Sequence, residues 1–443
     1  MATAPRVLRA LDPAERYFWL LGRIASVNGV LSAYVDRTFD EGELTDALRG
    51  LQRRHPLLRA RVDIVDDELV FVEADGEIPL TVLPLAPGQP SRTARLEVWP
   101  FEPAPHPLAA CIYEPVEGEE RSVVTLNVHH VLVDGNMART VLQQLMRMID
   151  EGATDVPVSD VVPDPLHARF PEALRSPRAA VEVVRAVRAE RDGQLPTSDF
   201  TFHDRLAPGL RPRNDLLALE GDALAAYLAR AKAQGASVTG LLGADILRAG
   251  AALFEVSEPR MLNFASAVDL RPRVEPPLPV DAAMVAIGML CTPYLVSDET
   301  RDTLGRTIGD QIAREVARGE SHLFYRFARV ATFPPTDAGE AAFAKWVDSA
   351  PQNITVSSLG RIDDAGDPPW LSRMAPIMAA TPNQVAFIAT LTYRGELTIS
   401  VATDSAKLAP EVADRFVSEI AARTGARLEA TTTFDPADAS VGG

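Results

Sequence analysis

The stretch Thr125–Thr140, TLNVHHVLVDGNMART, decides how the rest of this sequence is interpreted. Apolar and polar residues alternate over 124–128, which is the period of a half-buried strand, and two adjacent histidines close the run. Asp134 and Gly135 then form a turn signal, and apolar residues recur at helical spacing over 137–149. The pattern predicts a strand that passes through an Asp-Gly turn into a helix.

The two histidines, His129 and His130, are expected to differ in role. Adjacent strand residues point to opposite faces, so one ring can face a central channel while the other packs against the protein. The same divergence excludes a metal-dependent hydrolase built on the pair. The remaining histidines show no metal-ligand spacing, so no metal is expected; they are His55, His106, His167, His203 and His322.

Composition allows a large soluble enzyme and argues against nucleic acid as its partner. The chain has 443 residues, 47% of them hydrophobic, and its length predicts two or three domains. A formal net charge of -17 argues against a nucleic-acid partner. Two cysteines, Cys111 and Cys291, are too few for a disulfide framework and favour a reducing cytoplasm. No signal pattern and no apolar run of about 20 residues is present, so we expect a cytoplasmic protein that is not transmembrane.

Periodicity along the chain predicts an α/β protein in two halves. Asp12 and Glu15 predict a capped first helix, and Asp40 predicts a second. Short strands follow, and a hairpin over 108–130 would place the histidine strand in the interior of a sheet. The predicted division is an N-terminal lobe at 1–155, a connector at 156–215 and a C-terminal lobe at 216–443. In the second half we expect helices at 215–235, 238–254, 303–319 and 410–425, and strands at 260–271, 283–296, 352–362 and 384–404.

The spacing of the histidine stretch resembles that of a known family. His129, His130, Asp134 and Gly135 match the HHxxxDG signature of the chloramphenicol acetyltransferase-like superfamily, which includes condensation domains. Four fixed positions occur by chance on the order of once in a thousand such chains. Within it, the chain looks most like the phthiocerol/phthiodiolone dimycocerosyl transferase group of polyketide-associated acyltransferases. Weaker support comes from LDPAERYFWL at 11–20, RRHPLLRARV at 53–62, VDLR at 268–271 and VSSLGRID at 356–363.

The resemblance implies a fold and a catalytic base. It predicts two lobes, each a mixed sheet covered by helices, with an active-site tunnel between them and the histidine strand at its centre. His130 would take a proton from an acceptor hydroxyl or amine as that group attacks a thioester carbonyl. Neutral imidazole suits this task because its ordinary pKa is about 6.5. His129 is interpreted as structural.

The resemblance also implies roles around the base. Asp134 would pair with Arg271 rather than contact substrate, and it can cap the following helix at the same time. Gly135 would be required because a larger side chain at this position would block the channel or the turn. Ser357 or Ser358 could stabilise an oxyanion, but alternation predicts that only one of them points inward. Each serine could equally be a simple turn residue.

The expected function is that of an O-acyltransferase. It would move an acyl group from acyl-CoA or an acyl-phosphopantetheine carrier protein to a hydroxyl of a polyketide, lipid or other natural product, as a monomer and without a cofactor. Two alternatives stay open: a stand-alone condensation enzyme that forms an amide, and a non-catalytic scaffold of the same fold. The basic segments at 53–61, 211–213 and 271–273 could meet a donor phosphate or could be solvated charge.

Overall fold

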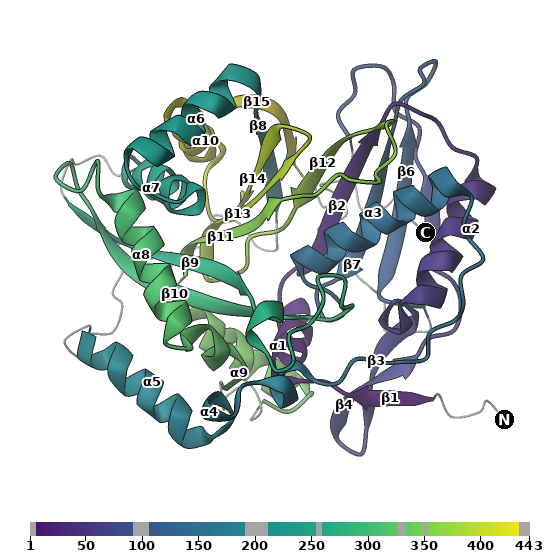
Figure 1. Ribbon diagram of the computed structural model, residues 1–443, viewed down its shortest axis with the longest axis horizontal. Helices are drawn as coiled ribbons and strands as arrows, with labels where there is room; N and C mark the ends of the chain where they lie inside the picture. The colour runs from purple at the N-terminus through teal and green to yellow at the C-terminus, as the bar shows by residue number, and fades with distance from the viewer. Residues whose placement is uncertain are drawn as a thin grey trace.

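The computed structural model describes residues 6–91, 106–190, 211–253, 259–326, 333–349 and 352–433. Two lobes stand side by side, each built on a mixed sheet with helices on its outer side (Figure 1). This confirms the fold class that the sequence predicts.

The first lobe is a five-stranded sheet in the order β12-β2-β7-β6-β5. The histidine strand β7 lies between antiparallel neighbours β2 and β6, so it is interior, as predicted. Its side chains are all buried, and α2 and α3 pack on the sheet through a shared apolar core. The elements are β2 (Asn28–Val35), α2 (Glu41–Arg54), β5 (Leu80–Val82), β6 (Ala109–Pro115), β7 (Ser122–His129), α3 (Gly135–Glu151) and β12 (Leu371–Ile377).

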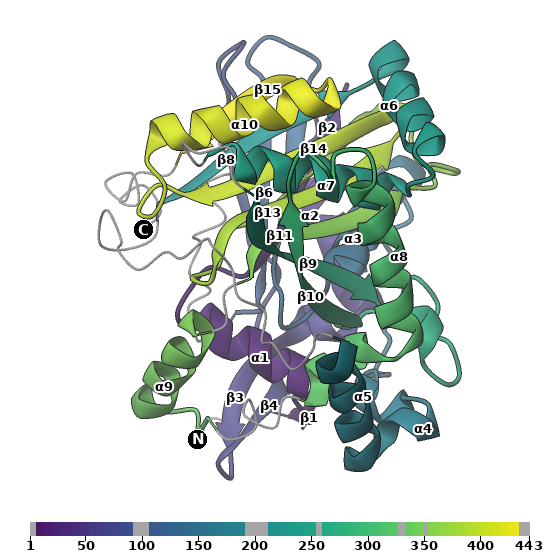
Figure 2. The ribbon, with the colours of Figure 1, turned by 90° about the vertical axis from the view of Figure 1, so that its left-hand side faces the viewer.

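The second lobe is a seven-stranded sheet in the order β10-β9-β11-β13-β14-β8-β15. Helices α6, α7, α8 and α10 cover its outer face, which Figure 2 shows from the side. The elements are β8 (Pro212–Leu219), α6 (Gly221–Ala233), α7 (Val238–Ala251), β9 (Arg260–Asp269), β10 (Ile287–Val296), α8 (Leu304–Ala317), β11 (Asn353–Arg361), β13 (Gln384–Tyr393), β14 (Glu396–Asp404), α10 (Pro410–Thr424) and β15 (Arg427–Thr433).

A small sheet and several short elements complete the molecule. The sheet has the order β1-β4-β3 and lies below the first lobe in Figure 1. The elements are β1 (Val7–Ala10), α1 (Pro13–Gly22), η1 (Pro56–Arg59), β3 (Ala60–Val65), β4 (Glu68–Glu73), η3 (Leu166–Arg169), α4 (Glu172–Arg175), α5 (Pro177–Glu190), η4 (Arg271–Arg273), η5 (Glu320–Arg326) and α9 (Asp337–Asp348). Helix α5 lies within the predicted connector, whose residues 191–210 are outside the described part of the chain.

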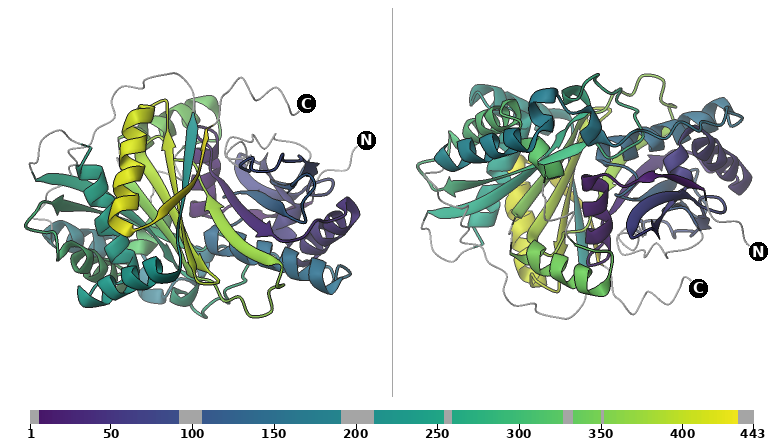
Figure 3. Two further views of the ribbon diagram at one scale, coloured as in Figure 1. Left: turned by 90° about the horizontal axis from the view of Figure 1, so that it is seen from above. Right: turned by 90° about the horizontal axis from the view of Figure 1, so that it is seen from below.

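One strand of the second half belongs to the first sheet. Strand β12 pairs antiparallel with β2, with Ile377 opposite Val30 and Ala375 opposite Ser32. In the view from above in Figure 3, it leaves the strands of the second lobe and reaches those of the first. The predicted division of the chain at residues 155 and 215 did not include this pairing of β12 with β2, because no local sequence pattern predicts which strands pair with each other.

The expected helix at 215–235 is wrong in its first part. Residues 215–219 complete strand β8, and the helix begins only at Gly221, whose φ is +53°. The apolar run 216–219 fits a buried strand as well as a helix, and its pairing with β14 and β15 decides the outcome.

The helix starts that the sequence predicts are present. Asp12 and Glu15 form a complete capping box at α1, and the Asp40 side chain accepts from the backbone N–H of Gly42 at α2. These caps are local, and for that reason the sequence alone was sufficient to predict them.

Candidate active site

His130 lies immediately after β7, in the turn that leads to α3. Its backbone N–H donates to the carbonyl of Val27 at 3.2 Å, which fixes it beside the start of β2. The imidazole stacks on the ring of Phe18 from α1, with centroids 3.8 Å apart and planes 4° apart. The side chain borders a cavity between the lobes, although the residue is only 8% exposed. One ring face is therefore held by Phe18.

His129 points the other way, as strand alternation predicts. Its Nδ1 accepts from the backbone N–H of Val131 at 3.1 Å, and its ring lies 5.7 Å from that of Trp19. A Cβ on Gly22 would stand 2.4 Å from His129 Nε2, so the helix α1 approaches this ring closely. Burial, with His130 adding to it, lowers the pKa of His129 to about 3. A neutral, packed His129 fits the structural role that the sequence predicts.

The protonation of His130 follows from its burial. Burial lowers the pKa of His130, and the nearby Asp134 carboxylate and the backbone of His130 and Val133 oppose the shift without reversing it. None of these groups meets Nδ1 with hydrogen-bond geometry, and Nδ1 has no partner within the described ranges. The imidazole is therefore neutral at pH 7 and able to accept a proton.

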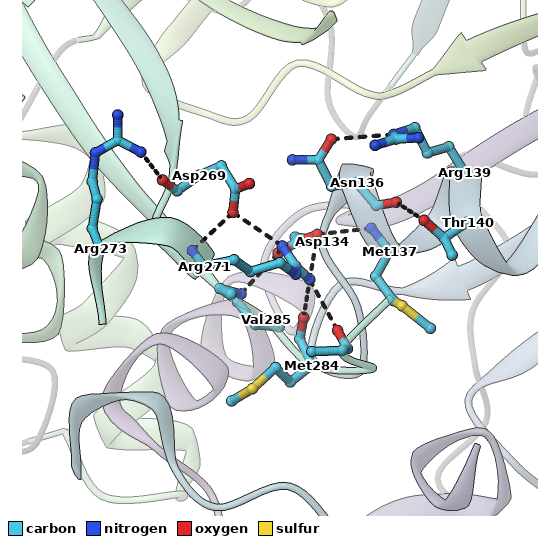
Figure 4. Close-up of polar contacts among 12 residues, drawn as sticks. Asp134, Asn136, Met137, Arg139, Thr140, Asp269, Arg271, Arg273, Met284 and Val285 are labelled. Atoms are coloured by element: carbon cyan, nitrogen blue, oxygen red, sulfur yellow. Dashed lines mark hydrogen bonds and ion pairs between the residues drawn. The ribbon is translucent and has the colours of Figure 1, made fainter. Parts of the chain in front are cut away.

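Within the described residues, Asp134 accepts four hydrogen bonds. Two come from backbone N–H groups and two come from the side chain of Arg271. Oδ1 accepts from the N–H of Met137 at 2.9 Å and caps α3, while Oδ2 accepts from the N–H of Ala286 at 2.8 Å. Arg271 donates to both oxygens, at 2.8 and 3.2 Å (Figure 4). Burial would raise the pKa of Asp134, but Arg271 and the backbone donors outweigh it and lower the pKa. The carboxylate is fully committed to structure.

Arg271 brings the second lobe to this carboxylate. It lies just past the end of β9, at the start of the short helix η4, so the expected strand at 260–271 ends two residues early. The side chain is 1% exposed and also donates to the carbonyls of Ala282 and Met284, at 3.1 and 2.9 Å. The predicted contact with Asp134 is present, and it joins residues 137 positions apart in the sequence.

Gly135 is the first residue of α3 and faces the second lobe. A Cβ at this position would lie 2.7 Å from Leu359 Cδ2, closer than such atoms approach. The glycine thus permits close contact between α3 and β11. This agrees with the prediction that a side chain at position 135 would be obstructive.

The cavity beside His130 has a volume of about 1210 Å³ including its opening. Most of its lining residues are apolar, and they come from both lobes: Leu21, Val30 and Ala138 from the first, for example, and Met289 and Phe387 from the second. A mostly apolar cavity with a few polar groups is typical of a small-molecule site. A mostly apolar cavity therefore lies between the lobes, where the sequence predicts the active-site tunnel.

Ser357 and Ser358 both border this cavity, although alternation predicted that only one would. Ser357 is half-buried and Ser358 is exposed. The cavity reaches both faces of β11 near its end, where the register against β13 is interrupted between Ser358 and Arg361. Both serines thus border the cavity as residues, and which hydroxyl points inward stays a prediction.

Sequence reasoning assigned no role to several polar and aromatic residues of the cavity. Tyr17 and Phe18 belong to the LDPAERYFWL segment, in which no pattern predicts that Phe18 stacks on His130. Ser26 borders the cavity with a buried Oγ that has no hydrogen-bond partner in the part of the chain described. Gln384 also lines it and donates to Gln352 and Thr355, which lie on another segment of the same sheet. These contacts are long-range and leave no local pattern.

Metal-ligand groups, disulfides and long apolar helices are three features that bear on the wider class of the protein. No group of three or more His, Cys, Asp or Glu side chains with the arrangement of a metal site occurs within the described ranges. Neither Cys111 nor Cys291 forms a disulfide among the residues that the structure describes. Among the helices described, none has the length and apolar character needed to cross a membrane.

The comparisons with known proteins agree with this architecture. Residues 208–402 match the family described as phthiocerol/phthiodiolone dimycocerosyl transferase C-terminus. No curated protein sequence matches the chain. Among solved structures, polyketide synthase associated protein 5 from Mycobacterium tuberculosis is 17% identical, with a TM-score of 0.61 over 95% of this chain and 99% of its own.

Two further solved structures share the fold. A trichothecene 15-O-acetyltransferase from Fusarium sporotrichioides is 13% identical, with a TM-score of 0.71 over 94% of both chains. A condensation domain from a monacolin K polyketide synthase is 14% identical, with a TM-score of 0.66 over 94% of this chain and 96% of its own. Residues 208–402 thus match the phthiocerol/phthiodiolone dimycocerosyl transferase C-terminus family, and the chain as a whole shares its fold with a polyketide synthase associated protein, an O-acetyltransferase and a condensation domain.

Proposed function

We propose that this protein transfers an acyl group from a thioester to the hydroxyl of an acceptor, with His130 as general base. The single observation that carries the proposal is a neutral, cavity-facing imidazole held by Phe18 and by the turn after β7. The match to a transferase family and the fold shared with an O-acetyltransferase support an acyltransferase. The donor would be acyl-CoA or an acyl carrier protein, and the acceptor a polyketide, lipid or other natural product.

The base works by proton transfer during attack. The neutral imidazole accepts the proton of the acceptor O–H as its oxygen bonds to the thioester carbonyl carbon. Collapse of the tetrahedral intermediate breaks the C–S bond, and the imidazolium returns the proton to the leaving thiolate. The products are an ester and a free thiol, and the histidine ends neutral, as it began.

The lowered pKa of His130 suits both halves of this cycle. The neutral form predominates before attack, so no proton has to be removed first. The imidazolium formed during attack is a stronger acid than free imidazolium, because burial disfavours its charge, and it gives its proton readily to the thiolate. Asp134 takes no part in the transfer, since Arg271 and two backbone N–H groups occupy its oxygens.

The cavity supplies the binding site for the acyl chain. Its apolar walls favour a hydrocarbon chain, and burying each methylene contributes about 0.8 kcal/mol. Ser357 and Ser358 are the candidate donors to the oxyanion, because both residues border the cavity on β11. Neither serine has a hydrogen bond that would hold it elsewhere among those the structure gives.

The test measures thiol release from acyl-CoA donors of increasing chain length, each with and without simple alcohols and amines. We expect alcohol-dependent release by the wild type and a loss of about 10² to 10⁴-fold in His130→Ala. His167→Ala is the matched control, because this exposed histidine lies outside the cavity lining and should retain activity. Circular dichroism of both variants checks that they fold.

Each outcome has a distinct reading. Release that requires an amine would replace ester formation with amide formation in the same site. Release that is equal in wild type and His130→Ala would refute the role of this base. If no CoA thioester reacts, the same panel is repeated with acyl carrier proteins as donors, and a failure there would favour the non-catalytic scaffold.

A further inference from the structure

A second pocket, lined by arginines, lies on the outer surface of the second lobe. It has a volume of about 810 Å³ including its opening, and lies between α6, α7, α10 and the turn before α8. Its lining contains four arginines and two aspartates, on a chain whose formal net charge is -17. The arginines are Arg230, Arg248, Arg301 and Arg423.

One of the four arginine charges is neutralised at the base of the pocket. Arg230 donates to Asp245, whose side chain is 10% exposed, and also to the carbonyl of Arg423 at 2.7 Å. Tyr227 donates to the same carboxylate at 3.1 Å. Burial raises the pKa of Asp245 to about 6 against the influence of Arg230. Both donors meet Oδ2 of Asp245, so the hydrogen bonds at the base of the pocket engage one oxygen of this carboxylate.

The other three arginines have weaker or more exposed partners. Arg248 donates to the Ser297 carbonyl at 3.3 Å, and its nearest carboxylate, that of Asp298, is 3.7 Å away and 94% exposed. Arg423 pairs with Glu419 one helical turn away. Arg301 is exposed, and its guanidinium makes no hydrogen bond or ion pair with the residues that the structure describes.

Two further observations show donors without acceptors and repulsion between like charges inside the pocket. The Nε atoms of Arg230 and Arg423 are buried and have no acceptor in the described part of the chain. Burial lowers the pKa of Arg248, and the Arg423 and Arg301 guanidinium groups lower it further, by more than any acidic neighbour raises it. Donors without acceptors and uncompensated like charges both favour a bound anion.

We propose that this pocket binds phosphate, either as the free ion or as a phosphomonoester. Guanidinium groups recognise phosphate by paired hydrogen bonds, and a group with two charges and several acceptor oxygens can engage more than one arginine at once. A carboxylate, with one charge and a single plane, would satisfy fewer of these donors. The ligand would link α6, α7 and α10 with the turn before α8.

The pocket is separate from the acyl-transfer cavity. Residues 267 and 269 of β9 and 355 and 357 of β11 line that cavity, whereas Phe264, Ile354 and Val356 face the opposite side and pack with the helices. The seven-stranded sheet therefore lies between the two sites, and the helices α6, α7 and α10 gather on its outer side in Figures 1 and 2. A phosphate bound here is not the donor molecule seated in the cavity.

The test is a calorimetric titration of the full chain with inorganic phosphate and with glycerol 3-phosphate, against sodium chloride of matched ionic strength. We expect saturable binding of at least one phosphate compound and none of chloride. Arg301→Gln should weaken it about tenfold, as the loss of one charge-assisted hydrogen bond of about 1.4 kcal/mol predicts. Arg306→Gln is the matched control, because this exposed arginine lies on α8 outside the pocket lining and should bind as the wild type does.

Arg248→Gln provides a second, independent variant inside the pocket and should also weaken binding. Tighter binding of glycerol 3-phosphate than of phosphate would identify a phosphorylated molecule as the ligand class, and the reverse would identify the free ion. The proposal is overturned if neither compound binds saturably, or if Arg301→Gln and Arg248→Gln both bind as tightly as Arg306→Gln.

Discussion

Breaking the ion pair between Asp134 and Arg271 should destabilise the whole protein, and its magnitude follows from the burial of both partners. The side chains are 0% and 1% exposed, and two hydrogen bonds of 2.8 and 3.2 Å join them. In Arg271→Met the carboxylate keeps only the N–H groups of Met137 and Ala286. A buried charge that loses its partner in this way costs about 3 to 5 kcal/mol in the free energy of unfolding.

The reverse substitution, Asp134→Asn, should cost a similar amount. The guanidinium keeps the carbonyls of Ala282 and Met284 and the Asp269 carboxylate at 3.3 Å. The new amide, however, places an Nδ2 donor among the N–H donors that the carboxylate accepted from. Because each single variant leaves one unpaired group, the double variant Asp134→Asn/Arg271→Met should be more stable than the sum of the two losses, by about 2 kcal/mol. The pair sits beside His130, so both single variants should also lose activity.

Urea unfolding followed by circular dichroism at pH 7 measures these free energies. Glu182→Gln is the control, because it breaks the exposed pair of Arg178 and Glu182 on α5 and should cost less than about 1 kcal/mol. The contribution of Asp134 is present at pH 7 and disappears as the pH falls through its lowered folded-state pKa, since the ordinary pKa is about 3.9. A loss below about 1 kcal/mol in Arg271→Met, or strict additivity in the double variant, would refute the reasoning.

Three further predictions concern the cavity. Because burial lowers the pKa of His130, the acid limb of kcat/KM should have its midpoint below 6.5, and a midpoint at or above 7 in a pH-rate profile would contradict the neutral base. Gly135→Ala should cost less than about 1 kcal/mol in urea unfolding, because the flexible end of Leu359 has to shift away from the new Cβ, and combining it with Leu359→Ala should remove that cost. Lys407→Met should cost about 1 to 3 kcal/mol in the same assay, because the buried Nζ donates to the carbonyl of Thr381, a residue of the cavity wall, at 2.9 Å. The KM should also rise as this wall becomes less ordered. An unchanged KM would show that other contacts hold the wall.

The parts of the site that could be predicted from the sequence are those whose signals are local. Asp134 was expected to cap α3 from its place at the start of the helix, and the divergence of His129 from His130 follows from strand alternation. The pairing of Asp134 with Arg271 was implied by the family resemblance, because no local signal joins residues so far apart. The interior position of β7 also followed from the hairpin pattern on one side and an earlier strand on the other.

The remaining features depend on contacts between distant segments. The stacking of Phe18 on His130 joins α1 to the turn after β7, and no periodicity in either segment announces it. Residues 215–219 have apolar content that suits a helix or a strand, and only their neighbours in the sheet assign them to β8. The approach of both Ser357 and Ser358 to the cavity depends on where the cavity ends, which is a property of two lobes rather than of one strand.

The crossing of β12 into the first sheet limits how this protein can be divided or recombined. A fragment that ends within the connector would leave the edge of β2, Asn28–Val35, without its neighbour, and that strand is largely buried in the intact protein. Such an open, apolar edge invites pairing with other chains, so the isolated fragment should aggregate. A chimera that exchanges the N-terminal lobe between relatives would therefore have to include Leu371–Ile377 from the same parent. The two halves of the chain cannot be exchanged as independent units.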